Sequence, residues 1–179
     1  YSTPIAIEVE GKTQLISLGS KALYAYDPDN GKELWRVDLG KSHSGACRPV
    51  YEHGLLYMPI GAGKELWAIR PGADKAEVAW KHTRSVPRRP SVVVVNDLLF
   101  MVDDDGIASC LNPVTGESLW QKRLGSNFSA TPLYADGRIY FLDEVGNAHV
   151  VKAAAEFESL AENKLDEGFM ASPAVSENA

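Results

Sequence analysis

Arginine and histidine side chains gather in two short segments of the sequence, and they are the residues best suited to holding an anion. The segment GKSHSGACR contains His43 and Arg48, and the segment KHTRSVPRR contains Arg84, Arg88 and Arg89. Guanidinium groups donate paired hydrogen bonds to carboxylates and phosphates, so this set could bind a small anionic ligand or an acidic protein partner. The alternative is a solvated rim, balanced by the acids Asp103, Asp104, Asp105, Asp143 and Glu144.

Other residue combinations do not predict a catalytic or metal site. Cys47 and Cys110 are neither adjacent nor spaced as Cys-x-x-Cys, so the sequence predicts no zinc site and no vicinal redox pair. The DDDG stretch at 103–106 lacks the alternating oxygen ligands and the distal glutamate of a calcium loop. No serine, histidine and aspartate stand in the local context of a known triad. We therefore expect no catalytic residue, no cofactor-binding residue and no metal ligand.

The bulk composition narrows the class of partner. Acidic residues outnumber basic ones by 24 to 18, which gives a formal net charge of −6, and this argues against a nucleic-acid partner bound through phosphate neutralisation. The sequence contains no run of about eighteen apolar residues, so it predicts no transmembrane segment. The chain begins at Tyr1 without an initiator methionine, so removal of a leader or of an upstream region is an open expectation.

A repeated motif shows which elements position these residues. AYDPDNGKELW at 25–35 has a near copy, CLNPVTGESLW, at 110–120. Trp35, Trp80 and Trp120 are 45 and 40 residues apart, and a further step of 40 falls on Leu160. Prolines that open apolar stretches keep the same period at Pro4, Pro49, Pro90, Pro132 and Pro173. Two markers with one period predict an internal repeat.

Each repeat contains four apolar segments separated by polar or glycine turns, which predicts four antiparallel strands. A four-stranded unit of this length is typical of a β-propeller blade, because stacked blades bury both faces of every sheet. The predicted blades span approximately 1–43, 44–84, 85–126 and 127–168, and 169–179 is expected to be the first strand of a further blade. SVVVVN at 91–96 is expected to be an innermost strand covered on both sides. Residues 152–164 have helical propensity, yet their place in the repeat favours a modified fourth strand.

The motif resembles the repeat of the PQQ-type β-propellers, which runs approximately Ala-x-Asp-x-x-Thr-Gly-x-x-x-Trp. This family includes quinoprotein alcohol dehydrogenases and outer-membrane assembly lipoproteins of the BamB kind. The first unit matches it at Ala25, Asp27, Gly31 and Trp35. The third unit matches it at Asn112, Thr115, Gly116 and Trp120, with Cys110 in place of alanine. The second unit keeps Ala68 and Trp80 but has Arg70 at the aspartate position, and the fourth has Lys152 there and no tryptophan.

The resemblance implies that these repeat residues are structural and that each tryptophan docks on the neighbouring blade. It also implies an all-β ring of about seven or eight blades, of which four lie in this chain and the rest in a longer parent chain. We expect a non-catalytic scaffold that binds a protein or ligand, in a periplasmic or extracellular location. The alternative is a fragment of a PQQ-dependent dehydrogenase. The resemblance gives that enzyme a vicinal disulfide beside the quinone, and no Cys-Cys pair occurs here, so we expect no bound cofactor.

Overall fold

Strands and turns make up the described secondary structure. The computed structural model describes residues 2–40, 46–60, 65–125 and 127–175. The first sheet contains β1 (Ile5–Val9), β2 (Lys12–Leu18), β3 (Ala22–Tyr26) and β4 (Glu33–Asp38), and the second contains β5 (Val50–Glu52), β6 (Leu55–Ile60), β7 (Glu65–Pro71) and β8 (Ala76–His82). The third contains β9 (Val93–Val95), β10 (Leu98–Val102), β11 (Ile107–Leu111) and β12 (Ser118–Arg123), and the fourth contains β13 (Leu133–Ala135), β14 (Arg138–Leu142), β15 (Asn147–Lys152) and β16 (Ser159–Lys164).

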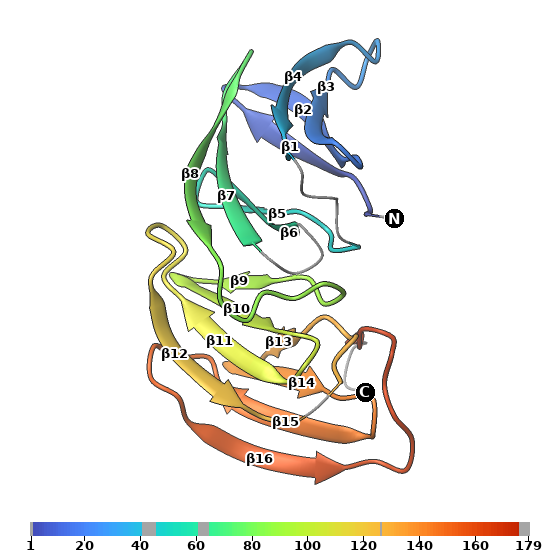
Figure 1. Ribbon diagram of the computed structural model, residues 1–179, viewed down its shortest axis with the longest axis vertical. Helices are drawn as coiled ribbons and strands as arrows, with labels where there is room; N and C mark the ends of the chain where they lie inside the picture. The colour runs from blue at the N-terminus through green and yellow to red at the C-terminus, as the bar shows by residue number, and fades with distance from the viewer. Residues whose placement is uncertain (1, 41–45, 61–64, 126, 176–179) are drawn as a thin grey trace.

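The four sheets stand side by side in an arc (Figure 1). Within each sheet the four strands pair in chain order, and each consecutive pair is antiparallel. The predicted all-β fold with four antiparallel blades is therefore confirmed. A ring of seven or eight blades stays a prediction.

Strand register makes the three tryptophans equivalent. Across the last two strands of a sheet, Ala25 faces Trp35, Ala68 faces Trp80 and Cys110 faces Trp120. Each ladder has a bulge directly after this pair. The predicted equivalence of the tryptophans is confirmed. We call the sheet face that bears them, which looks toward the following sheet, the forward face, and we call the opposite face the rear face.

Forward and rear faces pack together to form three apolar seams. The first seam joins Ile16, Leu23 and Trp35 to Leu56, Met58 and Ile69. The second joins Tyr57, Leu66 and Ala68 to Leu99, Met101 and Leu111. The third joins Phe100, Cys110 and Trp120 to Ile139, Phe141 and Val151. A single sheet would leave two apolar faces in water, so burial in these seams holds the arc together.

Two of the tryptophans dock on the turn between the third and fourth strands of the next sheet. The indole Nε1 of Trp80 donates to the carbonyl of Pro113 at 3.0 Å, and that of Trp120 donates to the carbonyl of Ala154 at 3.1 Å. Trp35 instead donates to Gln14 at 2.9 Å, and the amide of Gln14 donates onward to the carbonyl of Gly72 at 2.9 Å. The buried Gln14 thus connects Trp35 to the turn between β7 and β8 of the second sheet.

The fourth sheet departs from the predicted period by one residue. Val150 faces Ala161, so Ala161 occupies the tryptophan position, and the expectation for Leu160 is wrong. Leu160 is the bulge residue, which has no partner in the ladder. Val151 pairs with Ser159 eight residues later, whereas Tyr26 pairs with Glu33 and Leu111 with Ser118 seven residues later. The connection to the outer strand thus has one extra residue in the fourth sheet, which moves the repeat marker. The modified fourth strand predicted within 152–164 is present as β16.

One prediction about a first strand is wrong, because SVVVVN at 91–96 is not covered on both sides. Pro4, Pro49 and Pro132 directly precede β1, β5 and β13, whereas Val92 holds that place before β9 and Pro90 lies two residues earlier. The valines of β9 are only partly buried, because a first strand borders the open concave side. Residues 169–175 lie in no strand of the described chain, which contains no second strand for them to pair with, and 176–179 lie outside the described residues. The first strand of a further blade at 169–179 stays a prediction.

Candidate functional site

One end of the arc brings together the crossovers between sheets and the turns between second and third strands. The amide of Leu39 donates to the carbonyl of Lys21 at 2.8 Å, that of Leu124 donates to Gly106 at 2.9 Å, and that of Leu165 donates to Gly146 at 2.8 Å. These bonds hold the crossovers after the first, third and fourth sheets against a turn of their own sheet. We call this end the loop face.

Arg88 and Arg89 lie on the loop face beside two acids. The Nε of Arg89 donates to Asp104 at 2.6 Å, and its Nη1 donates to Glu144 at 3.0 Å. The backbone amide of Arg88 donates to Asp104 at 2.6 Å, and Ser129 donates to Glu144. Arg89 therefore links the turn of the third sheet to that of the fourth. The hydrogen bond to Asp104 raises the pKa of Arg89, so its charge is fixed.

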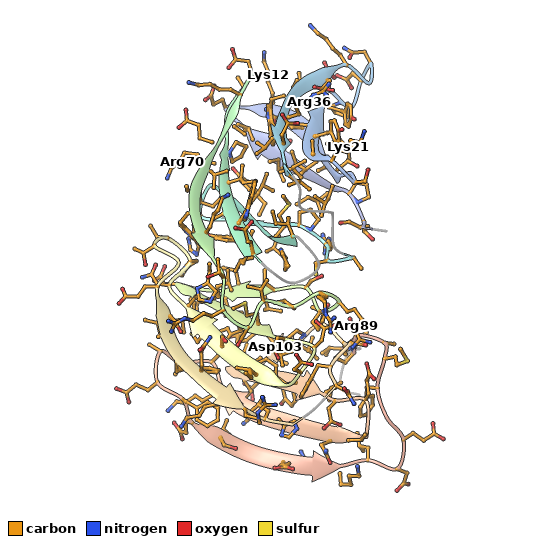
Figure 2. The ribbon with its side chains drawn as sticks, viewed as in Figure 1. Lys12, Lys21, Arg36, Arg70, Arg89 and Asp103 are labelled. Carbon is orange, nitrogen blue, oxygen red and sulfur yellow. The ribbon has the colours of Figure 1, made fainter. Side chains whose placement is uncertain are left out.

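Only part of this group is available to a ligand. The Asp104 side chain is 4% exposed, whereas that of Arg88 is 54% exposed and its Nε lies 3.6 Å from Asp104. Arg89 projects on the concave side of the arc, far from Arg70 on the convex side (Figure 2). The guanidinium of Arg88 is thus more accessible to a ligand than that of Arg89.

The aspartates that precede these acids have a structural role in the turns. Asp103 accepts the amides of Asp105 and Ile107, and Asp143 accepts those of Val145 and Asn147. Burial alone would raise the pKa of Asp143, but its hydrogen bonds from Asn147 and Val145 outweigh burial and lower it. Both carboxylates are engaged by their own loops. Neither is placed as a ligand for a cation.

Arg48 lies next to this cluster through its neighbour Cys47. The sulfur of Cys47 lies 3.2 Å from the carbonyl oxygen of Pro90 and 3.4 Å from that of Arg88, which brings the two crossovers into contact. Burial, with Asp104 nearby, raises the pKa of Cys47 to about 12. The thiol is therefore protonated at neutral pH and is a structural contact rather than a nucleophile.

Arg84 and His43 are the remaining residues of the predicted basic set. The carbonyl of Arg84 lies 2.9 Å from Nε2 of His82, and burial lowers the pKa of His82 so that its ring is neutral at pH 7. Within the described part of the chain, no carboxylate lies within ion-pair distance of Arg48 or Arg84. His43 lies outside the described residues.

A series of hydroxyl groups on the crossovers was not predicted. The amide of Arg48 donates to Ser91 at 2.9 Å, that of Ser91 donates to Thr131 at 3.0 Å, and that of Thr131 donates to Ser172 at 3.0 Å. Each hydroxyl caps an amide of the preceding sheet. The sequence signal is a serine or threonine two residues before a first strand, which is visible at Ser91 and Thr131 once the strand starts are known.

A buried histidine was also missed. His149 lies in the third seam, where its Nε2 is 3.6 Å from Asp143 and has no hydrogen-bond partner, and its ring lies 6.0 Å from that of Phe128. The sequence around His149 did not indicate a functional role, because an isolated histidine in an apolar strand is typical of a core position. His149 lies next to Asp143, whose neighbour Glu144 accepts a hydrogen bond from Arg89.

Comparison with known proteins agrees with this architecture. The sequence pattern of the family described as outer membrane protein assembly factor BamB matches residues 3–91 and 62–157. The chain belongs to this family of PQQ-type β-propeller repeats. Among solved structures, BamB from Moraxella catarrhalis superposes with a TM-score of 0.70 at 15% identity, over 92% of this chain and 53% of that one. At this identity the likeness shows the fold alone.

A curated relative belongs to a different functional class. A quinoprotein ethanol dehydrogenase from Pseudomonas putida is 28% identical over 158 residues, which cover 80% of this chain and 25% of the dehydrogenase. The PQQ-type repeat chain therefore spans a quarter of that relative and about half of the BamB structure. Among the described residues, none forms a helix of the length and apolarity that a bilayer crossing requires.

Proposed function

We propose that this PQQ-type propeller chain is a non-catalytic scaffold that binds a protein partner at its loop face, with Arg48, Arg84 and Arg88 as the contact cations. The observation that carries the proposal is the difference in pairing among the arginines. Arg89 is bound to two carboxylates within the fold, whereas Arg48 and Arg84 lack a carboxylate partner in the described chain and Arg88 is half exposed. Cations held on a rigid sheet end suit recognition of carboxylates on a partner.

The family supports a protein as the partner rather than a small anion. The matched family is described as an outer membrane protein assembly factor, and assembly requires contact with other proteins. An assembly role at the outer membrane would place the chain in the periplasm, and an extracellular location is the other one that the family resemblance implies. A small anionic ligand on the same arginines is the competing form of the proposal.

Site-specific cross-linking tests where a partner binds. A photo-reactive residue is placed at Arg48 or Arg88 in the protein expressed in its own host, and the cross-linked proteins are identified by mass spectrometry. We expect a protein that cross-links from both positions. The matched control is Arg138, which begins β14 and pairs with Asp136 at the opposite end of the sheet. Equal capture from Arg138, or capture from none of the three, would contradict the proposal.

A fragment of a quinoprotein dehydrogenase is the second candidate, because the curated relative is such an enzyme. The cysteines present do not fit the vicinal disulfide that the resemblance gives to the quinone site. Cys47 and Cys110 are buried, free thiols, of which Cys47 lies in the crossover before β5 and Cys110 lies on β11. Calorimetric titration with PQQ and calcium tests this candidate. Stoichiometric binding, with absorbance of bound quinone, would favour the enzyme over the scaffold.

A further inference from the structure

The first seam is closed differently from the other two at the end of the sheets opposite the loop face. In the second and third seams a tryptophan indole bonds directly to the turn of the next sheet, whereas Trp35 reaches that turn only through Gln14. The connection between β7 and β8 is also longer, because Ile69 pairs with Val78 nine residues later and the equivalent pair of the first sheet is seven residues apart. The indirect contact and the longer turn leave space between the first two sheets.

A cavity of about 490 Å³ occupies this space. It is lined by residues 11–14 at the start of β2, by residues 27–29 in the turn after β3, by Leu34 and by Ala73 in the turn between β7 and β8. Both sheets therefore contribute to its walls. Its volume lies in the range of protein sites that bind small molecules.

Three polar side chains of the lining are engaged inside the fold. Both ends of the Gln14 amide are hydrogen-bonded, at 2.9 Å each. Both carboxylate oxygens of Asp27 accept donors of its own turn, also at 2.9 Å each. The hydroxyl of Thr13 donates to Glu8. These groups shape and stiffen the walls of the cavity, and recognition of a ligand falls to the remaining charged groups.

Lys12 and Asp29 are those remaining groups, and both are exposed. In the described part of the chain neither side chain forms an ion pair, with the other or with a third residue. Two opposite charges that border one cavity without meeting can both be paired by a ligand that carries an anion and a cation. Pro28, Leu34 and Ala73 add apolar surface between them.

We propose that this cavity binds a zwitterionic peptide of about two residues, whose carboxylate pairs with Lys12 and whose ammonium group pairs with Asp29. The apolar surface of the lining contacts a side chain of the peptide. This site goes beyond the proposed function, because the cavity and the loop face lie at opposite ends of the sheets. The binding of a protein at the arginines and the binding of a peptide here can therefore succeed or fail separately.

Calorimetric titration with the dipeptides glycyl-leucine and leucyl-glycine tests the ligand. We expect saturable binding of at least one of them with one site per chain. N-acetylation and C-terminal amidation each remove one charge of the peptide, and each should weaken binding by about fivefold. Equal affinity for the modified and unmodified peptides would overturn the proposal. The absence of saturable binding of both dipeptides up to about 10 mM would overturn it as well.

Charge exchange in the protein tests the site. Lys12→Glu and Asp29→Lys should each weaken dipeptide binding by about fivefold, and the double variant should restore it, because the peptide can bind in the reverse direction. Lys21→Glu is the matched control, since Lys21 lies in the turn after β2, at the other end of that strand and well apart from Lys12 (Figure 2). All these side chains are exposed, so the variants keep the core intact. An equal loss for Lys21→Glu, or a double variant as weak as the single ones, would overturn the proposal.

Discussion

At the scale of single residues, one glycine limits how closely two sheets approach. Gly116 has a φ of 73°, and a Cβ there would lie 2.6 Å from the ring of Trp80. We predict that Gly116→Ala lowers the free energy of unfolding by about 2–4 kcal/mol, because backbone strain and overpacking add. Urea unfolding at pH 7, followed by tryptophan fluorescence, measures the loss.

Gly31 provides the matched control, because it occupies the same place in the first repeat. Its φ is 72°, and a Cβ added there would meet nothing within 4 Å. Gly31→Ala should therefore cost only the backbone strain, about 1–2 kcal/mol. Equal losses for the two variants would show that contact with Trp80 does not matter.

Two buried thiols make stability depend on alkaline pH. Burial raises the pKa of Cys110 to about 12 from a usual value of 9.0, and Cys47 behaves alike. Between these values the unfolded chain loses the thiol proton and the folded chain keeps it, so stability falls as pH rises. The slope is about 1.4 kcal/mol per pH unit for each thiol.

We predict that Cys110→Ala makes the alkaline loss of stability shallower, because the variant lacks one of the two titrating thiols. Alanine fits this position, since Ala25 and Ala68 occupy the equivalent position in the first two sheets. Urea midpoints across the alkaline range, compared with the unsubstituted chain, measure the change. An unchanged slope would mean that Cys110 does not titrate on unfolding.

At the scale of elements, Arg89 connects the third and fourth sheets through Asp104 and Glu144. Arg89→Gln should lower the free energy of unfolding by about 1–2 kcal/mol, because Asp104 is buried and keeps only the amide of Arg88 and a distant guanidinium. Arg138→Gln is the control, since its partner Asp136 is 85% exposed. Chemical unfolding in low and high salt measures both, and a similar loss for Arg138→Gln would contradict the assignment.

The individual elements show why the sequence predicted some features of the fold correctly and others not. The motif at 25–35 predicted its turn and strand correctly because Asp27, Gly31 and Trp35 each have a local physical role. Leu160 was misplaced because one added turn residue changes the period without changing composition. The pairing of Arg89 with Glu144 joins residues 55 positions apart, and nothing local to either segment indicates it. Partners across a seam become visible only when the register is known.

At the scale of the whole molecule, each internal sheet is covered on two faces and each terminal sheet on one. The second and third sheets contribute to two seams each, whereas β16 is exposed along its full length and lacks a tryptophan at Ala161. Local opening costs least where few apolar contacts are lost. We therefore predict that amide hydrogen exchange is slowest in β6, β7, β10 and β11 and fastest, among the strands, in β16.

Mass-spectrometric exchange at neutral pH measures this ranking, with β12 as the internal comparison for β16. The two are equivalent outer strands, but the Trp120 of β12 docks on the fourth sheet through its bond to Ala154. Trp120→Phe removes that bond and should bring the protection of β12 closer to that of β16. If β16 were as protected as β12 in the unsubstituted chain, its stability could not depend on the seam contacts that a tryptophan supplies. Such a result would show that the outer strands are stabilised by their own ladders instead.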